Sequence, residues 1–278
     1  MKRSLRPLWH IVAFYLLCFV ALGILEVAVG AVLGPRAVDS REVLFQWLTL
    51  ASVVLATWIM LRRVEKLPWS TVGLDRAAAL PQLIFQGAAW GGLTIGVASL
   101  LLFGIHMLRI DPATPGGWWG EAWHSTLVFL PAGFFEELFI RGYVFAVLRR
   151  NWGWKMALIV SSVVFGLLHA WNPGADAESI LAVTVAGFFL GAIFLATRSL
   201  YAAGAAHFAW NWVMSGLLHI AVSGVPSRDP DYRVVETGPD WLTGGPWGPE
   251  GGFVAVAAMF VGIFYLYGRY LRRMEWKA

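Results

Sequence analysis

Long apolar stretches, each close to the length that crosses a lipid bilayer, constrain the fold of this chain most strongly. A membrane-spanning helix needs about 20 mostly apolar residues. Eight stretches of the 278-residue sequence approach this requirement: 9–33, 43–61, 83–105, 121–148, 155–171, 179–197, 200–222 and 252–271. The sequence therefore predicts an all-α polytopic membrane protein, built as a bundle of about eight transmembrane helices.

The composition separates this class from a soluble enzyme that carries a single anchor. Hydrophobic residues make up 58% of the chain and charged residues only 14%, whereas soluble domains carry about 25% charged residues. The deficit extends along the whole length. The 16 tryptophans agree with a membrane protein, because tryptophan concentrates at membrane interfaces.

The distribution of basic residues predicts the orientation. If the N-terminus is cytoplasmic, 15 of the 21 Lys and Arg residues fall on the cytoplasmic side and five on the other, while Arg141 lies inside a span. Cytoplasmic loops normally carry this excess, so we expect an N-in, C-in integral membrane protein. The net charge of +4 is small and not gathered in one patch, so no nucleic-acid partner is expected. The expected partners are the lipid bilayer and a membrane-associated substrate.

The basic, then apolar, start of the chain leaves two interpretations open. It has the order of a signal peptide, but the apolar run is longer than usual and no small-x-small cleavage site ends it. We favour a retained first helix. Cys18 is the only cysteine, which excludes an intramolecular disulfide and a cysteine-based metal site.

Charged residues inside a predicted span point to a site. The stretch FFEELFIRGYVF places Glu136, Glu137 and Arg141 in the fourth span, where each ionisable residue costs at least about 2.5–3.5 kcal/mol. These side chains must face a protein interior or a wet cavity. Glu137 and Arg141 are four residues apart, the spacing of a helical ion pair. Glu136 lies about 100° around the helix and has no evident partner there.

Two later spans supply polar residues at a similar depth. Phe165 and His169 are four residues apart in FGLLHA, and His207 and Asn211 are four apart in HFAWN, so each pair shares a helix face. At a rise of about 1.5 Å per residue, Glu136, His169 and Asn211 each lie roughly 20 Å from the basic residue at the cytoplasmic end of their span, with His207 one turn lower. The sequence predicts that these side chains meet.

Simpler interpretations exist for each residue taken alone. Glu137 and Arg141 would serve as a structural ion pair, and Phe165 as packing beside His169. A single buried histidine is commonly an interhelical hydrogen-bonding residue. Four further histidines lie near helix ends, where we expect them to be interfacial and solvated: His10, His106, His124 and His219.

Taken together, the motifs resemble a known family. EELFIR is similar to the Glu-Glu-x-x-x-Arg motif of the CAAX prenyl protease and bacteriocin-processing (CPBP) membrane proteases, also called the abortive-infection family. FGLLH and HFAWN are similar to its Phe-x-x-x-His and His-x-x-x-Asn motifs, in the same order. TGGPWGPEGG, before the last span, resembles bacterial-type members, so the resemblance implies a multi-pass protein of a bacterial-type plasma membrane.

The resemblance implies an intramembrane endopeptidase with defined roles. Glu136 would be the base that activates water, and His169 would hold that water. His207 and Asn211 would stabilise the oxyanion, while Glu137 and Arg141, with Phe165, would orient the site. The chemistry agrees, because peptide hydrolysis needs an activated water and donors aimed at the developing oxyanion.

The sequence leaves one alternative for the use of a metal and one for the function. Glu136, His169 and His207 are a ligand set that zinc accepts, and the family is often described as metalloproteases. There is no HExxH motif, and a glutamate base suffices, so we favour a route that requires no cofactor. The alternative to a protease is a non-catalytic scaffold, an immunity-type binding protein or a transporter, since a transporter also places Glu, His and Arg in a central cavity.

The predicted spans and motifs divide the chain into three regions. Residues 1–119 hold the first three helices and a surface segment, and residues 120–222 hold the CPBP-like catalytic core. Residues 223–278 hold an extracytoplasmic loop and the last helix. Residues 223–251 are rich in Gly, Pro and Asp, which is typical of a loop.

Overall fold

A computed structural model describes residues 5–33, 41–111, 116–228 and 231–271. Six basic residues used to predict the orientation lie outside these ranges: Lys2, Arg3, Arg36, Arg272, Arg273 and Lys277.

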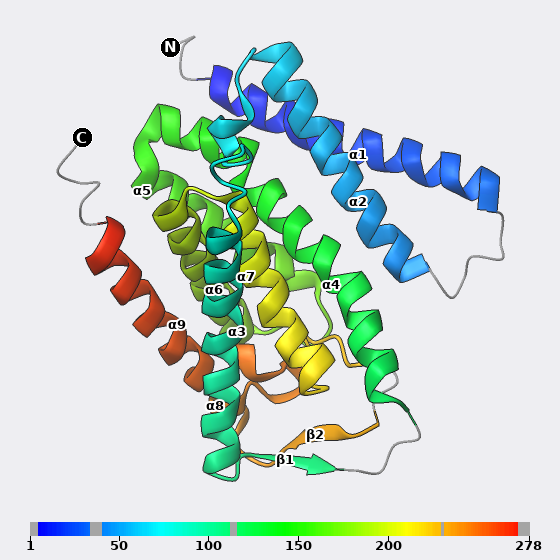
Figure 1. The fold of residues 1–278 in the computed structure, drawn as a ribbon, viewed down its shortest axis with the longest axis vertical. Coiled ribbons are helices and arrows are strands. Elements are labelled where there is room, and N and C mark those ends of the chain that lie inside the picture. The colour runs from blue at the N-terminus through cyan, green and yellow to red at the C-terminus, as the bar shows by residue number, and fades with distance from the viewer. Residues whose placement is uncertain (1–4, 34–40, 112–115, 229–230, 272–278) are drawn as a thin grey trace.

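The described chain is mostly helical (Figure 1). Its helices are α1 (Arg6–Leu33), α2 (Arg41–Trp58), α3 (Pro81–Gly104), α4 (Trp118–Arg141), α5 (Tyr143–Leu168), α6 (Ala177–Thr197), α7 (Leu200–Trp212), α8 (Asp240–Thr243) and α9 (Phe253–Leu266). The strands β1 (Leu108–Asp111) and β2 (Arg233–Glu236) lie at one end of the bundle, which we call the β1–β2 end. The start of α1 and the end of α9 lie toward the opposite end.

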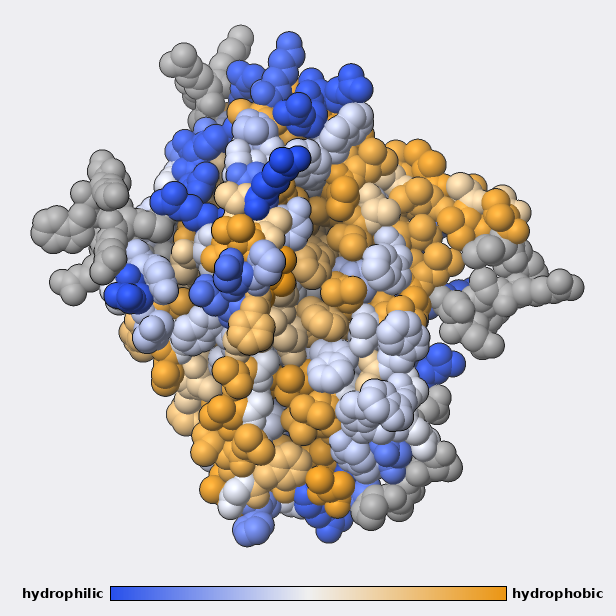
Figure 2. All heavy atoms as spheres, in the orientation of Figure 1, coloured by the Kyte–Doolittle hydropathy of each residue, from blue (hydrophilic) through white to orange (hydrophobic). Residues whose placement is uncertain are grey.

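The structure confirms an all-α polytopic membrane protein. Within the described residues, six helical stretches are long and apolar enough to cross a membrane: 6–32, 41–64, 81–104, 118–171, 177–197 and 253–270. The stretch 118–171 contains two of the eight expected spans, and α7 falls outside the six. Figure 2 shows the matching surface, with hydrophobic residues over most of the flank and hydrophilic residues gathered mainly at the upper end.

The expected span 121–148 is wrong as a single helix. The helix α4 ends at Arg141, and Gly142 leaves the helical region with φ −80° and ψ −113°. A Cβ at this position would lie 2.2 Å from the Leu138 carbonyl oxygen, so only glycine permits the bend. A second break follows inside α5 at Gly153, where φ is 84°. These breaks produce the bent path of α5 in Figure 1.

Small residues bring α3 and α7 into close contact. A Cβ on Gly87 would lie 2.0 Å from the Ala202 carbonyl oxygen, and one on Gly91 would lie 1.9 Å from that of Ala206. Both pairs repeat at a spacing of four residues, the small-xxx-small pattern with which membrane helices approach each other closely. This contact fixes α7, the helix that carries His207.

The two strands and one buried histidine depart from the sequence prediction. No strand was expected, yet β1 pairs antiparallel with β2, from Leu108 opposite Glu236 to Asp111 opposite Arg233. The expectation that His219 is interfacial and solvated is wrong, because it is only 4% exposed. The loop after α7 folds back under the bundle, and this placement encloses the ring.

A charged cluster joins α1 to α5 at the end of the bundle opposite the strands. The Glu65 Oε1 accepts a hydrogen bond from the Tyr143 hydroxyl at 2.7 Å and lies 2.7 Å from His10 Nδ1. Its Oε2 accepts a hydrogen bond from Arg150 at 2.6 Å. Burial alone would raise the pKa of Glu65, but hydrogen bonds from Tyr143, Arg150 and His10 outweigh it and hold this pKa below its usual range.

This cluster predicts a pH-dependent stability. A carboxylate with a lowered pKa contributes stability that is present above its unfolded-state pKa and is lost as the pH falls through the folded-state value. We therefore expect the thermal unfolding temperature in detergent to fall on acidification below about pH 5, and Glu65→Gln to flatten this dependence. Glu178→Gln, at an exposed position of α6, is the control. An unchanged pH profile in Glu65→Gln would contradict the assignment.

Candidate active site

A proline positions the acidic part of α4. Pro131 lies inside this helix and has no N–H, so the Leu127 carbonyl loses its helical partner. The Trp47 Nε1 of α2 donates to that carbonyl instead, at 3.1 Å. The Trp47 indole therefore takes the place of the missing amide donor. This hydrogen bond joins α2 to the part of α4 that precedes Glu136.

Glu136 faces two histidines from two other helices. Its Oε2 lies 3.9 Å from His169 Nε2 and 3.8 Å from His207 Nε2. The His169 Nδ1 lies 2.8 Å from the Phe165 carbonyl oxygen, which can only accept, so the ring carries hydrogen on Nδ1. This leaves Nε2 directed toward Glu136. The Glu136 side chain is 27% exposed, so it is reachable from outside the bundle.

The helix α7 carries the other histidine and an asparagine. Ser199 caps this helix, accepting a hydrogen bond from the Ala202 amide at 3.0 Å and donating to the Ala78 carbonyl at 2.6 Å. His207 and Asn211 are 7% and 6% exposed. They lie one turn apart on the same face, as their spacing of four residues requires.

The second glutamate and the arginine form a fully enclosed pair. Arg141 Nη1 donates to Glu137 Oε1 at 2.6 Å, and both side chains are 0% exposed. Arg141 Nη2 donates to the Gly187 carbonyl of α6 at 2.8 Å. The same Glu137 oxygen lies 3.3 Å from His207 Nδ1. The pair therefore connects α4, α6 and the site histidine of α7.

Phe165 packs at the centre of these groups. Its ring centroid lies 4.8 Å from that of His169 and 5.7 Å from that of His207. The Arg141 guanidinium carbon lies 4.9 Å from the ring centroid, a distance at which a cation is attracted to an aromatic face. The structure thus brings Glu136, Glu137, Arg141, Phe165, His169, His207 and Asn211 into one region.

Two cavities meet at Phe165 and His169. One has a volume of about 220 Å³ and is lined by Phe135, Glu136, Phe139, Ile140, Phe165, Leu168, His169 and Asn172. The other is enclosed, with about 30 Å³, and its walls include His169, His207, Asn211, Ser223 and Glu250. A polar cavity of the smaller size is large enough for a water molecule.

Glu250 is a wall residue that the sequence motifs did not identify. It is 7% exposed and sits in the short turn Pro249–Gly251 before α9. Its Oε2 accepts a hydrogen bond from Trp210 Nε1 at 2.8 Å, and its Oε1 accepts from the Ser223 amide at 2.6 Å and hydroxyl at 2.7 Å. The only available signal was an acidic residue within a Gly- and Pro-rich loop.

Removal of this carboxylate should open the enclosed cavity. Glu250→Ala leaves the buried Trp210 and Ser223 donors without an acceptor, at about 1–3 kcal/mol for each unsatisfied group. We expect a lower unfolding temperature in detergent and reduced turnover of any substrate. Glu178→Ala, which removes an exposed carboxylate, should leave both values nearly unchanged. Equal behaviour of the two variants would contradict a role for Glu250 in the cavity wall.

The helices that carry the motifs lie within a segment that matches a family model. Residues 118–213 match the family model described as Type II CAAX prenyl endopeptidase Rce1-like. We call residues 118–213 the Rce1-like core, after this match. At the family level, the match supports a CAAX-type intramembrane protease. Comparisons with curated proteins and with solved structures gave no match.

The Rce1-like core contains the whole motif set. It begins at the start of α4 and ends one residue after α7. All seven predicted site residues, from Glu136 to Asn211, fall inside it. Glu250 falls outside, although it lines the smaller cavity. The helices α3 and α9 also fall outside, and they pack against α7 and α6 respectively.

Glu136, His169 and His207 are the side chains that would hold a zinc ion in this region. Zinc sites usually place their ligand atoms about 2.0–2.1 Å from the ion. Within the described ranges, no group of three His, Cys, Asp or Glu side chains is arranged to hold a metal ion. Glu136, His169 and His207 are therefore not preformed as a zinc ligand set in the part of the chain that the structure describes.

Proposed function

We propose that the chain is an intramembrane endopeptidase in which Glu136 activates a water molecule. One observation carries the proposal: the Glu136 carboxylate lies within 4 Å of two histidine Nε2 atoms from different helices, at 3.9 and 3.8 Å. Separations above about 3.5 Å suit polar groups that share a water. The proposed nucleophile is a water held by Glu136 and His169.

The reaction follows from this arrangement. Glu136 accepts a proton from water as the water oxygen bonds to the scissile carbonyl carbon. The tetrahedral intermediate then collapses, the carbon–nitrogen bond breaks, and the proton moves from Glu136 to the departing nitrogen. The products are one peptide with a new carboxylate and one with a new amine. No other reactant is needed.

His207 and Asn211 are proposed to stabilise the oxyanion. They lie one turn apart at the wall of the enclosed cavity, where donors act in a low-dielectric environment and so have a large effect. The Glu137 carboxylate beside His207 Nδ1 holds the ring orientation, so that Nε2 faces the site. Arg141 in turn fixes Glu137.

The larger cavity supports a membrane-associated protein or peptide as substrate. Its walls carry Phe135, Phe139, Ile140 and Leu168 around the Glu136 carboxylate, so it suits an extended chain with apolar side groups. A prenylated CAAX-type protein is one member of this class. We also propose a bacterial-type plasma membrane as the location, on the resemblance of TGGPWGPEGG.

The second candidate function is a non-catalytic scaffold, an immunity-type binding protein or a transporter on the same fold. Such a protein would keep the Glu137–Arg141 pair for stability but would not need Glu136, His169, His207 and Asn211 together. The complete set favours the protease.

Comparison of peptide termini tests this proposal. Cells expressing the wild-type chain and cells expressing Glu136→Gln, at matched membrane levels, would be compared by proteomics of N-termini and C-termini. New termini found only with the wild type support a protease, and their sequences define the substrate class. If neither set of termini differs, the binding or transport function takes precedence.

Metal dependence is tested separately by chelation. Because the proposed base, water-holding group and oxyanion donors are all side chains of this chain, activity should persist in a chelator such as EDTA at millimolar concentration. The measurement is the initial cleavage rate of the purified protein before and after chelator treatment. If chelation abolishes cleavage and added zinc restores it, the metal-independent route is overturned.

A further inference from the structure

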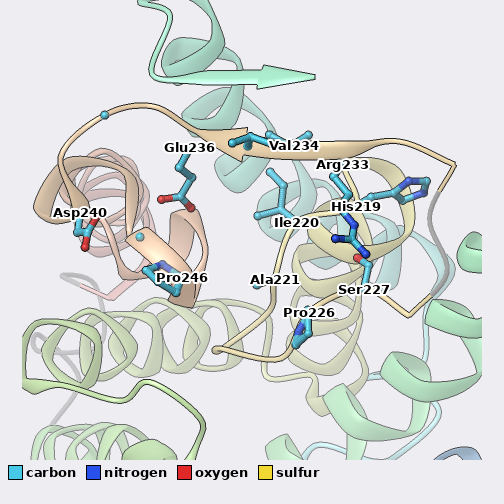
Figure 3. A pocket seen from close by; sticks show the side chains of 13 residues that line it. His219, Ile220, Ala221, Pro226, Ser227, Arg233, Val234, Glu236, Asp240 and Pro246 are labelled. Carbon is cyan, nitrogen blue, oxygen red and sulfur yellow. The ribbon is translucent and has the colours of Figure 1, made fainter. Parts of the chain in front are cut away.

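A larger cavity lies at the β1–β2 end, apart from the two described above. Its volume is about 630 Å³, within the range of roughly 300–1,000 Å³ typical of small-molecule sites. Ser227 and Arg233 line one end of it, Glu236 and Asp240 line the other, and His219 lies in the wall (Figure 3). None of the residues that line it lines the catalytic cavities.

His219 is held rigidly in the wall of this cavity. Its side chain is 0% exposed, and its Nδ1 lies 3.3 Å from the Tyr232 carbonyl oxygen and 3.4 Å from Asp231 Oδ1. The ring stacks on Tyr232 with a centroid distance of 4.3 Å. Its backbone has φ +53°, a conformation that is uncommon outside glycine and often marks functional positions. Its buried Nε2 has no hydrogen-bond partner within the described residues.

Two further groups join His219 at the same end of the cavity. The buried Ser227 hydroxyl also has no hydrogen-bond partner among the described residues. The Arg233 side chain reaches from β2 toward Ser227 in Figure 3. An anionic ligand that accepts hydrogen bonds from the Ser227 hydroxyl and the Arg233 guanidinium would satisfy this unpaired hydroxyl. A carboxylate suits a planar guanidinium in particular.

The other end of the cavity is acidic. Glu236 and Asp240 line it, and the Glu236 Oε2 accepts a hydrogen bond from the Thr243 hydroxyl at 2.8 Å. Burial, with a smaller contribution from Asp240, raises the pKa of Glu236 to about 7. A cationic group placed between these two carboxylates would stabilise their charged forms.

The distance between the two ends indicates the length of the ligand. Arg233 and Glu236 are three residues apart in one extended strand, which corresponds to about 10 Å along its axis. An extended peptide of three residues has about the same length, at roughly 3.3–3.6 Å per residue. Apolar residues line the cavity between the ends, including Ile220, Pro226 and Val234.

We propose that this cavity binds a short linear peptide of about three residues through both of its free ends. The peptide carboxylate lies at Ser227 and Arg233, and the peptide ammonium lies at Glu236 and Asp240. The apolar walls contact the side chains between them. The proposal does not rest on the protease activity, and on the predicted orientation the cavity opens on the extracytoplasmic side.

Blocking each end of a probe peptide tests the proposal on the unmodified protein. Binding of tri-alanine to the purified full chain in detergent would be measured by isothermal titration calorimetry, beside N-acetyl-tri-alanine and tri-alanine amide. We expect each blocked peptide to bind at least tenfold more weakly than tri-alanine. Equal binding of all three, or no binding of tri-alanine at millimolar concentration, would overturn the proposal.

Substitutions at the two ends place the binding in this cavity. Arg233→Gln and Glu236→Gln should each raise the Kd for tri-alanine at least tenfold. Arg109→Gln is the matched control, since this exposed arginine lies on β1 opposite Val235 and does not line the cavity. Tri-alanine binding that survives both cavity substitutions would overturn the location. Binding of glycerophosphoethanolamine in place of tri-alanine would overturn the peptide and indicate a lipid headgroup.

Discussion

Replacing Glu136 with glutamine is expected to lower the cleavage rate by about 10²–10⁴-fold, the usual contribution of a general base, or to below detection. The amide keeps the shape of the side chain but cannot accept the proton of the attacking water. Because Glu136 is partly exposed and its Oε2 lies at least 3.8 Å from either histidine, the variant leaves no charge stranded in the core. The wild type and Glu136→Gln should therefore insert and unfold alike.

Two measurements distinguish a loss of chemistry from a loss of folding in Glu136→Gln. The unfolding temperature in detergent shows that the fold is intact, and the initial rate on a substrate found by the termini comparison reports the chemistry. Glu178→Gln, an exposed change of the same kind, should keep the full rate. Wild-type turnover in Glu136→Gln would remove this residue as the base and with it the proposed mechanism.

Arg141→Ala and Glu137→Ala are expected to be the most destabilising single changes in the chain, at about 3–5 kcal/mol each. Each leaves the partner as an uncompensated charge in a fully buried position. Arg141→Ala also removes the donor to the Gly187 carbonyl, so the contact between α4 and α6 weakens. The expected results are poor accumulation in the membrane and a strongly lowered unfolding temperature in detergent.

A double variant tests whether the loss of stability comes from leaving one charge unpaired. Glu137→Leu combined with Arg141→Met removes both charges at similar volume, so it should lose much less stability than the sum of the two single losses. It should nevertheless lose activity, because His207 Nδ1 no longer has the Glu137 carboxylate 3.3 Å away. Single variants as stable as the wild type would show that the pair does not hold the helices together.

Helical geometry explains why the site region was predictable from sequence. The spacing of four residues between Glu137 and Arg141, and between His207 and Asn211, is local and follows from 3.6 residues per turn. The shared depth of Glu136, His169 and Asn211, with His207 one turn lower, needed only the rise per residue and one basic marker for each helix. These quantities do not depend on how the helices pack, so a single sequence carries them.

The features missed by sequence depend on contacts between distant residues. Gly142 interrupts an apolar run without changing its hydropathy, so a span drawn from hydropathy alone passes through the break. The pairing of β1 with β2 joins residues more than 120 positions apart, and neither strand is longer than four residues. Glu250 and His219 looked like loop or interfacial residues until the fold enclosed them.

The position of Glu250 shows that the cavity is completed by residues beyond the segment that matches the family model. The segment recognisable as Rce1-like stops at residue 213, but the enclosed cavity is completed by a carboxylate from the turn before α9. The helix α7, which carries His207 and Asn211, is also packed through Ala202 and Ala206 against α3, which precedes the match. Transplanting residues 118–213 into another protein would therefore carry all the motif residues but leave their cavity open to its surroundings.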